Sequence, residues 1–164
     1  MKILAFGDIY SDMGEQPFYA NGLRFSCTRC SACCRYESGF VYLSKNDVSM
    51  LAAQLKIGYN EVVDKYCRWV ETYGELRLSL REKSNYDCIF WDQRCVVYSG
   101  RPLQCRTFPF WQSILSSAEA WNCAAGSCPG MGRGDMRTRE EIDDCLTRSS
   151  TEELISKKIP GGKG

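Results

Sequence analysis

Histidine is absent from the 164-residue sequence, and this absence narrows the chemistry open to the protein. Zinc sites with mixed cysteine and histidine ligands are excluded, as are histidine general bases and the serine or cysteine triads that need one. Any zinc ion here must be held by cysteines, with or without a carboxylate. Iron–sulfur clusters, which are normally held by four cysteines, suit this composition equally well.

Long apolar runs and an excess of charge are also missing. No run approaches the roughly 20 apolar residues that cross a bilayer. The 21 basic and 20 acidic residues are mixed along the chain and leave a net charge of +1, which favours neither a nucleic-acid surface nor a polybasic membrane anchor. The apolar start is interrupted by Asp8 and Asp12, and no small-residue cleavage site follows. We therefore expect a cytoplasmic protein with no nucleic-acid or membrane partner.

Cysteine, by contrast, is abundant, and four of the 11 cysteines form the run Cys27-Thr28-Arg29-Cys30-Ser31-Ala32-Cys33-Cys34. A C-x2-C spacing brings two thiolates to the same side of a turn, as in the chelating run of bacterial ferredoxins. Cys34 adjoins Cys33, and neighbouring side chains usually diverge, so we expect one of the two to serve another metal or another strand. A disulfide framework is the alternative. The odd number of cysteines and the expected reducing compartment favour metal.

The hydrophobic pattern predicts short helices and strands. Ser44 and Asp47 predict a capping box before a helix that ends at Gly58, and Asn60 begins a second helix through Tyr73. The other elements expected are strands at 3–6, 39–43 and 76–80, and a helix from Thr138, capped by Glu141, to about Arg148. Cys67 and Cys145 fall on apolar helix faces, so we interpret both as core residues.

Two further cysteines begin the two arms of a predicted hairpin, Cys88-Ile89-Phe90-Trp91 and Cys95-Val96-Val97-Tyr98. These two thiols can share a metal, face opposite sides of the hairpin, or be small core residues. Another cysteine, Cys105, lies one helical turn after Pro102. The aromatic residues that follow can shield a metal site or pack in an ordinary core; they are Phe108, Phe110 and Trp111.

Arginines flank several of these cysteines. Arg101 and Arg106 lie on either side of Cys105 in an otherwise apolar segment, so we expect them to offset thiolate charge. Most of the other arginines near cysteines are interpreted as facing solvent; they are Arg29, Arg35 and Arg94. After Cys128, the three glycines at 130, 132 and 134 lack a preceding strand and the G-x-G-x-x-G spacing of a nucleotide loop. We interpret them as a ligand-bearing turn with close backbone approach.

The cysteine run with Arg35, the hairpin cysteines, the segment 101–111 and the segment 128–134 together resemble the YkgJ-like cysteine-cluster family. The resemblance spans about residues 22 to 135. Members of this family are described as zinc- or iron-chelating proteins, and the module also resembles one found in flagellin lysine methylases. The resemblance implies a metal-ligand role for eight cysteines: Cys27, Cys30, Cys33, Cys34, Cys88, Cys95, Cys105 and Cys128. Cys123 and Cys145 lie outside the pattern.

The expected fold is a small, irregular, single α+β domain with short helices and a β-hairpin, organised around a cysteine metal site. Its expected divisions are an N-terminal lead-in at 1–21, a metal-binding domain at 22–135, a C-terminal helix at 136–149 and a polar tail at 150–164. Three functions stay open: a structural or metal-handling site, an iron–sulfur protein for electron transfer or sensing, and an accessory to protein lysine methylation with a protein partner.

The choice of metal rests on the ligand spacing. The C-x2-C-x2-C run can supply three corners of a cubane cluster, and a remote cysteine such as Cys105 or Cys128 can supply the fourth. We therefore favour an iron–sulfur cluster over zinc, although two four-cysteine zinc sites use all eight ligands without remainder. No S-adenosylmethionine fingerprint is present, and neither is the C-x3-C-x2-C spacing of radical enzymes. A self-sufficient methyltransferase is therefore not expected.

Overall fold

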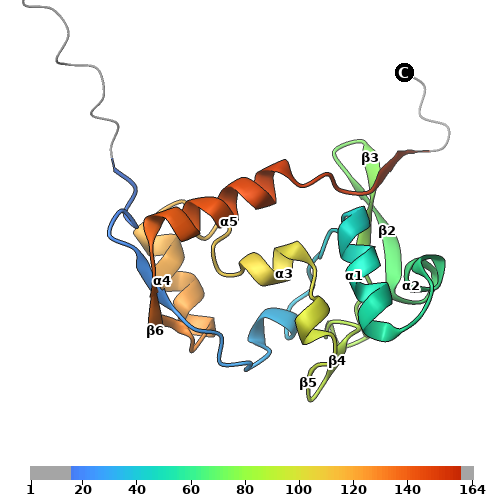
Figure 1. The fold of residues 1–164 in the computed structure, drawn as a ribbon, viewed down its shortest axis with the longest axis horizontal. Helices are drawn as coiled ribbons and strands as arrows, with labels where there is room; N and C mark the ends of the chain where they lie inside the picture. Colours follow the sequence, from blue (N-terminus) through green and yellow to red (C-terminus); the bar gives the residue numbers. More distant parts are fainter. Residues whose placement is uncertain (1–15, 160–164) are drawn as a thin grey trace, which may run out of the picture.

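Two separate hydrophobic clusters form the interior of the protein, as described by a computed structural model over residues 16–159. The first, here called the α1–α2 cluster, comprises Leu43, Val48, Leu51, Val62, Cys67, Leu78, Leu80, Phe90 and Val97. The second, the β1–β6 cluster, comprises Tyr19, Phe25, Phe110, Leu115, Trp121, Met131 and Ile142. Helix α3 (Leu103–Thr107) lies between them, and α5 (Arg139–Thr151) runs from one side to the other (Figure 1). The expected small α+β class is confirmed.

Local sequence signals account for the start of the first cluster. In the capping box of α1 (Lys45–Leu55), the Ser44 hydroxyl accepts the Asp47 N–H at 3.1 Å and the Asp47 carboxylate accepts the Ser44 N–H at 3.2 Å. This box was predicted and is confirmed. Helix α2 (Tyr59–Tyr66) follows, and α1 and α2 bury Val48, Leu51 and Val62.

The predicted second helix is wrong beyond Tyr66. Residues Cys67–Thr72 instead form strand β2, which pairs antiparallel with β3 (Glu75–Leu80) in the register Cys67↔Leu80. Tyr73 and Gly74 at the turn have φ of 48° and 79°, the left-handed pair that closes a two-residue hairpin with matching twist. Pairing with β3 therefore overrides the helical spacing, and Cys67 still enters the core, at 3 % exposure.

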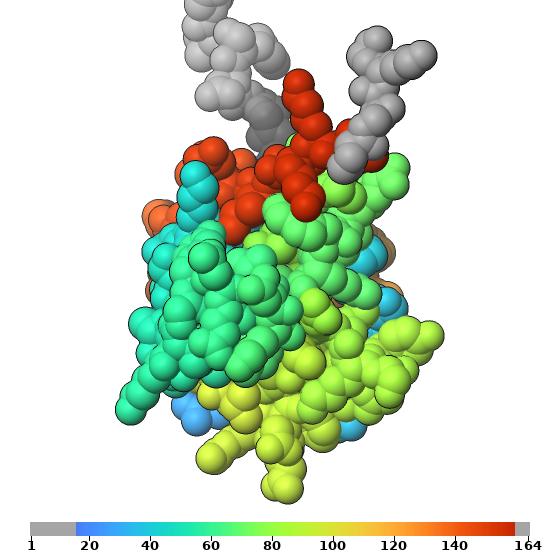
Figure 2. Space-filling view, turned by 90° about the vertical axis from the view of Figure 1, so that its right-hand side faces the viewer, coloured from blue at the N-terminus to red at the C-terminus, as the bar shows by residue number. Residues whose placement is uncertain are grey.

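The second edge of β3 is shared by two segments that are distant in sequence. Strand β7 (Ser156–Lys158), which the sequence analysis assigns to a polar tail, pairs with the first half of β3. Figure 2 shows this segment, in red, against the green β2–β3 hairpin. The strand expected at 39–43 is reduced to a single bridge, Tyr42↔Ser79, beside the second half of β3.

The second cluster forms around β1 (Leu23–Phe25), which pairs antiparallel with β6 (Met131–Arg137). Helix α4 (Ala118–Ser127) adds Trp121, whose ring stacks on Phe110 at 6.0 Å between centroids. The capping box predicted at Thr138 and Glu141 is confirmed at the start of α5. That helix continues to Thr151, beyond the expected end near Arg148. Within residues 16–159, every helix is too short or too polar to cross a bilayer.

Short, irregular elements fill the space between the clusters and carry Cys33, Cys34 and Cys95. They are the 3₁₀ helix η1 (Ala32–Cys34), β4 (Trp91–Asp92), β5 (Arg94–Cys95) and the 3₁₀ helix η2 (Tyr98–Gly100). The expected hairpin exists, but its strands have only two residues each, because Gln93 turns the chain at φ 56° directly after β4. The strand expected at 3–6 lies outside the described residues.

Two glycines hold the start of the cysteine run against β6. A Cβ at Gly130 would overlap the Ser26 carbonyl oxygen, and a Cβ at Gly134 would overlap the Ser26 hydroxyl. Ser26 also accepts the Asp135 N–H at 3.0 Å through its hydroxyl. The expected close backbone approach is therefore observed at these two glycines, and it fixes the chain one residue before Cys27.

We predict that Gly130→Ala destabilises the protein by about 1–3 kcal/mol, because the added methyl group displaces backbone that cannot rotate away. Gly126→Ala is the matched control. Gly126 lies in α4 with no atom within 4 Å of an added Cβ, so alanine there stabilises by up to about 1 kcal/mol through helix propensity. Urea unfolding under reducing conditions measures both changes. Equal effects of the two substitutions would contradict the prediction.

Candidate metal centre

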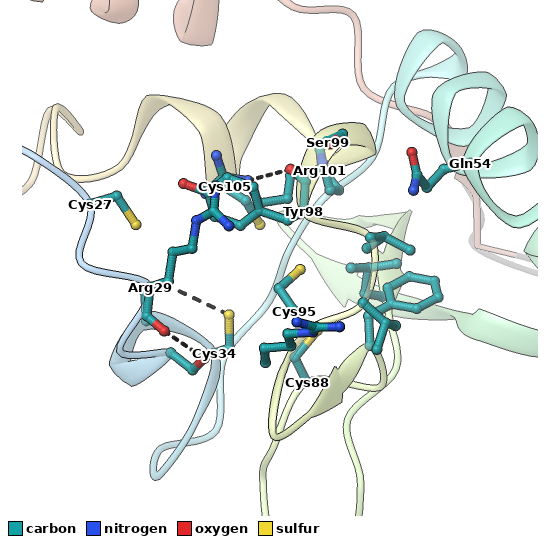
Figure 3. Close-up of a pocket in the computed structure, with 18 residues that line it drawn as sticks. Cys27, Arg29, Cys34, Gln54, Cys88, Cys95, Tyr98, Ser99, Arg101 and Cys105 are labelled. Atoms are coloured by element: carbon teal, nitrogen blue, oxygen red, sulfur yellow. Dashed lines mark hydrogen bonds between the residues drawn. The ribbon is translucent and has the colours of Figure 1, made fainter.

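Six of the eight predicted cysteine ligands line one cavity of about 350 Å³, here called the cysteine cavity. They are Cys27, Cys33, Cys34, Cys88, Cys95 and Cys105. Figure 3 shows the sulfurs of Cys34, Cys95 and Cys105 turned toward the same space, with Cys27 at its edge. Among the described residues, no aspartate or glutamate lines this cavity, but three arginines do. The wall therefore offers sulfur donors in a cationic setting.

A backbone hydrogen bond joins two of the four chain segments that supply these thiols. The Cys88 N–H donates to the Cys34 carbonyl at 2.7 Å, which joins η1 to the hairpin segment. Within α3, the Cys105 N–H donates to the Pro102 carbonyl at 3.0 Å. Arg29 and Ser31 both have positive φ, 58° and 64°, and these left-handed residues let the C-x2-C-x2-C run fold back on itself.

Cys30 and Cys128 are not part of the lining of the cavity. Cys128 caps the C-terminus of α4 and packs against the β1–β6 cluster. Burial raises the pKa of the Cys128 thiol, and the negative charges of Cys30 and Cys33 raise it further. Cys128 therefore lies within electrostatic reach of Cys30 and Cys33.

The adjacent thiols of Cys33 and Cys34 do not diverge as expected. Their Sγ atoms lie 3.7 Å apart on η1. Two thiolates about 2.3 Å from one tetrahedral ion would be separated by about 3.8 Å. The contact with the Cys34 thiol lowers the pKa of Cys33 to about 7, with Arg101 also favouring its thiolate, and the same contact raises the pKa of Cys34. The contact therefore favours the thiolate on Cys33 and the thiol on Cys34.

Burial is the main influence on the remaining thiols of the cavity. It raises the pKa of Cys88, Cys95 and Cys105, and neighbouring thiolates raise each of them further. Arg101 opposes this rise at Cys95 and Cys105. Thiolates gathered in this space thus require more positive charge than the arginine supplies, and a bound metal ion would provide it.

Arg106, expected beside the thiols, has a different position. Its Nε donates to the Arg101 carbonyl at 2.9 Å, and its guanidinium lies 3.7 Å from the Asp47 carboxylate. Arg106 lines a separate cavity bounded by Phe25, Phe108 and α5 residues. Of the two arginines that were expected to offset thiolate charge, only Arg101 faces the cysteine cavity.

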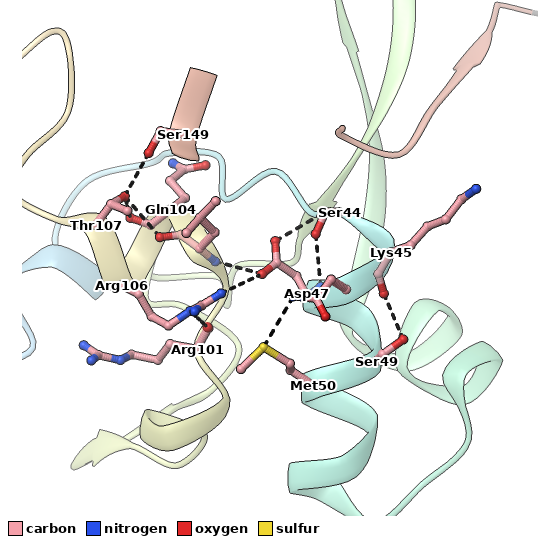
Figure 4. A network of polar contacts seen from close by, with 12 residues as sticks. Ser44, Lys45, Asp47, Ser49, Met50, Arg101, Gln104, Arg106, Thr107 and Ser149 are labelled. Carbon is pink, nitrogen blue, oxygen red and sulfur yellow. Dashed lines mark hydrogen bonds and ion pairs between the residues drawn. The ribbon is translucent and has the colours of Figure 1, made fainter. Parts of the chain in front are cut away.

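Asp47 ties the helix that carries Cys105 to helix α1. Its side chain is 1 % exposed; one oxygen accepts the Leu103 N–H at 2.8 Å and the other accepts the Ser44 N–H at 3.2 Å (Figure 4). The first of these bonds satisfies an N–H at the start of α3 that has no partner within the helix. One buried carboxylate thus sets the position of α3, and with it Cys105, relative to α1.

The other cysteines lie apart from the cysteine cavity. Cys67 is buried in the α1–α2 cluster, where its Sγ donates to the Val62 carbonyl at 3.6 Å and burial raises its pKa to about 11. Cys145 packs on the β1–β6 cluster, and Cys123 is exposed on α4.

Of the aromatic residues expected around the site, Phe108 and Trp111 line a second cavity of about 330 Å³. That cavity shares Cys33, Cys34, Cys88 and Cys105 with the first.

The donor chemistry fits zinc or iron, because every ligand-type side chain on the cavity wall is a thiol. Across residues 16–159, however, no three cysteine, aspartate or glutamate side chains stand close enough to hold a metal ion as they are placed. The structure gathers the thiols around one space but does not draw them into a closed coordination sphere.

Several residues of this site were missed or assigned elsewhere in the sequence analysis. Arg29 and Arg94 are exposed, as expected, but they also line the cavity, which was not expected. Tyr98, expected in a strand, begins the 3₁₀ helix η2, and two guanidinium groups stack on its ring. The proximity of Arg29 and Arg94 to cysteines was the available signal. Nothing in the sequence indicated the role of Tyr98.

A family model and a curated relative both match this chain. The model of the CxxCxxCC family, described as "Putative zinc- or iron-chelating domain", matches residues 26–129, which include all eight predicted ligands. The chain is also similar to an uncharacterized protein of Methanocaldococcus jannaschii, with 34% identity over 132 residues. That alignment covers 75% of this chain and 66% of the relative, slightly less than two thirds of its length. No solved structure matches the chain.

We predict that Asp47→Asn destabilises the protein by about 2–3 kcal/mol. The two carboxylate oxygens each accept a buried N–H, and an asparagine can satisfy only one of them. Asp64→Asn, on the exposed side of α2, is the control and should change stability by less than about 0.5 kcal/mol. Urea unfolding measures both, and indistinguishable midpoints would refute the role assigned to Asp47.

Proposed function

This chain belongs to the CxxCxxCC family of zinc- or iron-chelating domains, and we propose that it holds an iron–sulfur cluster in the cysteine cavity for electron transfer or redox sensing. The observation that carries the proposal is the convergence of six thiols from four chain segments on one space without a carboxylate. The proposed ligands are drawn from the six cavity thiols together with Cys30 and Cys128. Cysteines without disulfide bonds are typical of a reducing compartment, so the proposal includes a cytoplasmic location.

Spacing and volume support a cluster rather than a single ion. Cys27, Cys30 and Cys33 follow the C-x2-C-x2-C pattern, and Cys105 and Cys128 are the remote candidates for a fourth ligand. A cavity of about 350 Å³ leaves room for a polynuclear centre between the sulfurs. When bound, such a cluster supplies a one-electron couple whose potential depends on burial and on hydrogen bonds to sulfur.

The protein's own residues would set those two conditions. Leu80, Phe90 and Val97 are buried residues on the apolar side of the cavity, where they exclude water. Arg101 lies against the thiols and lowers the pKa of Cys33, Cys95 and Cys105. Its guanidinium is the donor best placed to stabilise negative sulfur. Arg106 acts indirectly, through Asp47 and the backbone of Arg101.

A structural zinc module is the second candidate, and one distance favours it. The 3.7 Å separation of the Cys33 and Cys34 sulfurs matches two thiolates on a single tetrahedral ion. In a cubane, each cysteine ligand binds a different iron atom, and adjacent thiolates are farther apart. No comparable observation favours the methylation accessory role suggested by the flagellin methylases, and we do not propose it.

We predict that protein purified without oxygen is brown, contains acid-labile sulfide and loses most of its iron on Cys105→Ser. Loss of a ligand should weaken metal binding by at least about tenfold. Cys123→Ser is the matched control, because Cys123 is exposed on α4 and lies off the cavity. Iron, zinc and sulfide analyses with a visible spectrum measure the outcome. A colourless protein with about two zinc ions per chain and no sulfide would select the zinc module instead.

We also predict that metal binding contributes on the order of 10 kcal/mol to stability, since irregular segments carry most of the ligands. A chelator under reducing conditions should then disorder residues 25–36 and 86–130 while leaving the β2–β3 hairpin more protected. Hydrogen exchange and near-ultraviolet circular dichroism report the change. An unaltered melting temperature and unaltered spectrum after metal removal would argue against it.

A further inference from the structure

Three arginines on the wall of the cysteine cavity have guanidinium groups without a carboxylate partner. Within residues 16–159, Arg29, Arg94 and Arg101 form no ion pair with aspartate or glutamate. Other arginines near the cysteine run are neutralised, such as Arg35, whose Nε lies 3.0 Å from the buried Asp87 carboxylate. No described carboxylate therefore pairs with these three arginines, and the cavity thiolates, which Arg101 favours, are the only other anionic groups on the same wall.

Two of these guanidinium groups are held on the same aromatic ring. The guanidinium carbon of Arg101 lies 3.6 Å from the centroid of the Tyr98 ring, and that of Arg29 lies 4.4 Å from it. Stacking fixes the plane of a guanidinium group and leaves its edge N–H groups free. Arg101 uses only its Nε, which donates to the Tyr98 carbonyl at 2.9 Å. Like charges held this close repel one another unless an anion lies between them.

The backbone at Arg29 is itself strained. Its φ of 58° lies in the left-handed region, which an arginine rarely adopts. Such conformations persist where the surrounding structure requires them, and they concentrate at ligand sites. In the described structure, the Arg29 side chain has the Tyr98 ring as its contact and is otherwise exposed. A long side chain is thus held over a ring at the solvent side of the cavity.

The arginines differ in what they face. Arg101 is the half-buried one, and it favours the thiolate forms of Cys33, Cys95 and Cys105. Arg29 and Arg94 are exposed at the mouth. Three residues with neutral donors, Tyr98, Ser99 and Gln54, line the same cavity, and Figure 3 shows Gln54 on its α1 side. The cavity wall therefore offers hydrogen-bond donors as well as sulfur.

We propose that the mouth of the cysteine cavity binds a small molecule bearing an oxyanion, a phosphate or a carboxylate, through Arg29, Arg94 and Arg101. Guanidinium edges match both groups in bidentate geometry, and a cavity of about 350 Å³ lies in the range of small-molecule sites. Tyr98 fixes the orientation of two of the three arginines. The inference rests on the proposed function only in placing this anion beside thiols that hold metal.

The test is calorimetric titration of the full chain, purified without oxygen, in chloride buffer of constant ionic strength. Phenyl phosphate is the phosphate probe and benzoate is the carboxylate probe, since neither forms a chelate ring with a bound metal as pyrophosphate or citrate would, and saturable binding of one of them identifies the anion class. Arg29→Gln should weaken that binding by about tenfold or more, and Arg29→Lys, which keeps the charge without the planar fork, should weaken it less. Arg133→Gln is the control, since Arg133 is exposed on β6 and lies off the cavity.

Metal content is measured on every variant and should equal that of the wild type in Arg29→Gln. Circular dichroism checks the fold, and Arg94→Gln gives a second reading if Arg29→Gln is unfolded. The inference is overturned if neither probe binds, if Arg133→Gln is as weak as Arg29→Gln, or if Arg29→Gln loses its metal. If the wild-type protein contains no metal but binds a probe through Arg29, the metal-binding proposal is refuted. The anion-binding proposal is then retained.

Discussion

The buried carboxylate of Asp47 is the interaction on which the arrangement of this protein depends most. It begins as a local feature, half of the capping box of α1, but its second oxygen accepts an N–H from α3, 56 residues further along. Because α3 carries Cys105 and is followed by the aromatic residues of the second cluster, one side chain sets the spacing between both cores and the thiols. Arg106 completes this junction by facing Asp47 rather than the thiols.

Irregular structure around the thiols follows from the needs of ligands. Sulfurs that must face one space from four segments cannot all lie on regular helices or strands, whose side chains spread around an axis or alternate between faces. The chain instead uses a 3₁₀ turn, two-residue strands and left-handed residues at Arg29, Ser31 and Gln93. Two ordinary hydrophobic clusters on either side supply the stability that such segments lack.

The sequence predicted the features that depend on neighbours along the chain. Both capping boxes, α1, β3 and the α+β class were predictable because their signals lie within a few residues. The second helix failed beyond Tyr66 because β2 is specified by its partner strand and by the turn at Tyr73 and Gly74, which helical spacing does not encode. For the candidate site, spacing indicated the cysteine run 27–34 and the family resemblance added the remote cysteines; six of these eight line one cavity. The stack on Tyr98 and the turning of Arg106 toward Asp47 depend on contacts between distant segments.

The order in which the two clusters are completed has a consequence for synthesis on the ribosome. Strand β1 precedes the cysteine run, but its partner β6 is made more than 100 residues later, and β3 lacks one neighbour until Ser156–Lys158 emerges. At about 5–20 residues per second, the thiols of Cys27 to Cys34 spend several seconds in a nascent chain without either finished core. During that interval their reduced state depends on the compartment and its chaperones, since the fold that will gather them around one cavity does not yet exist.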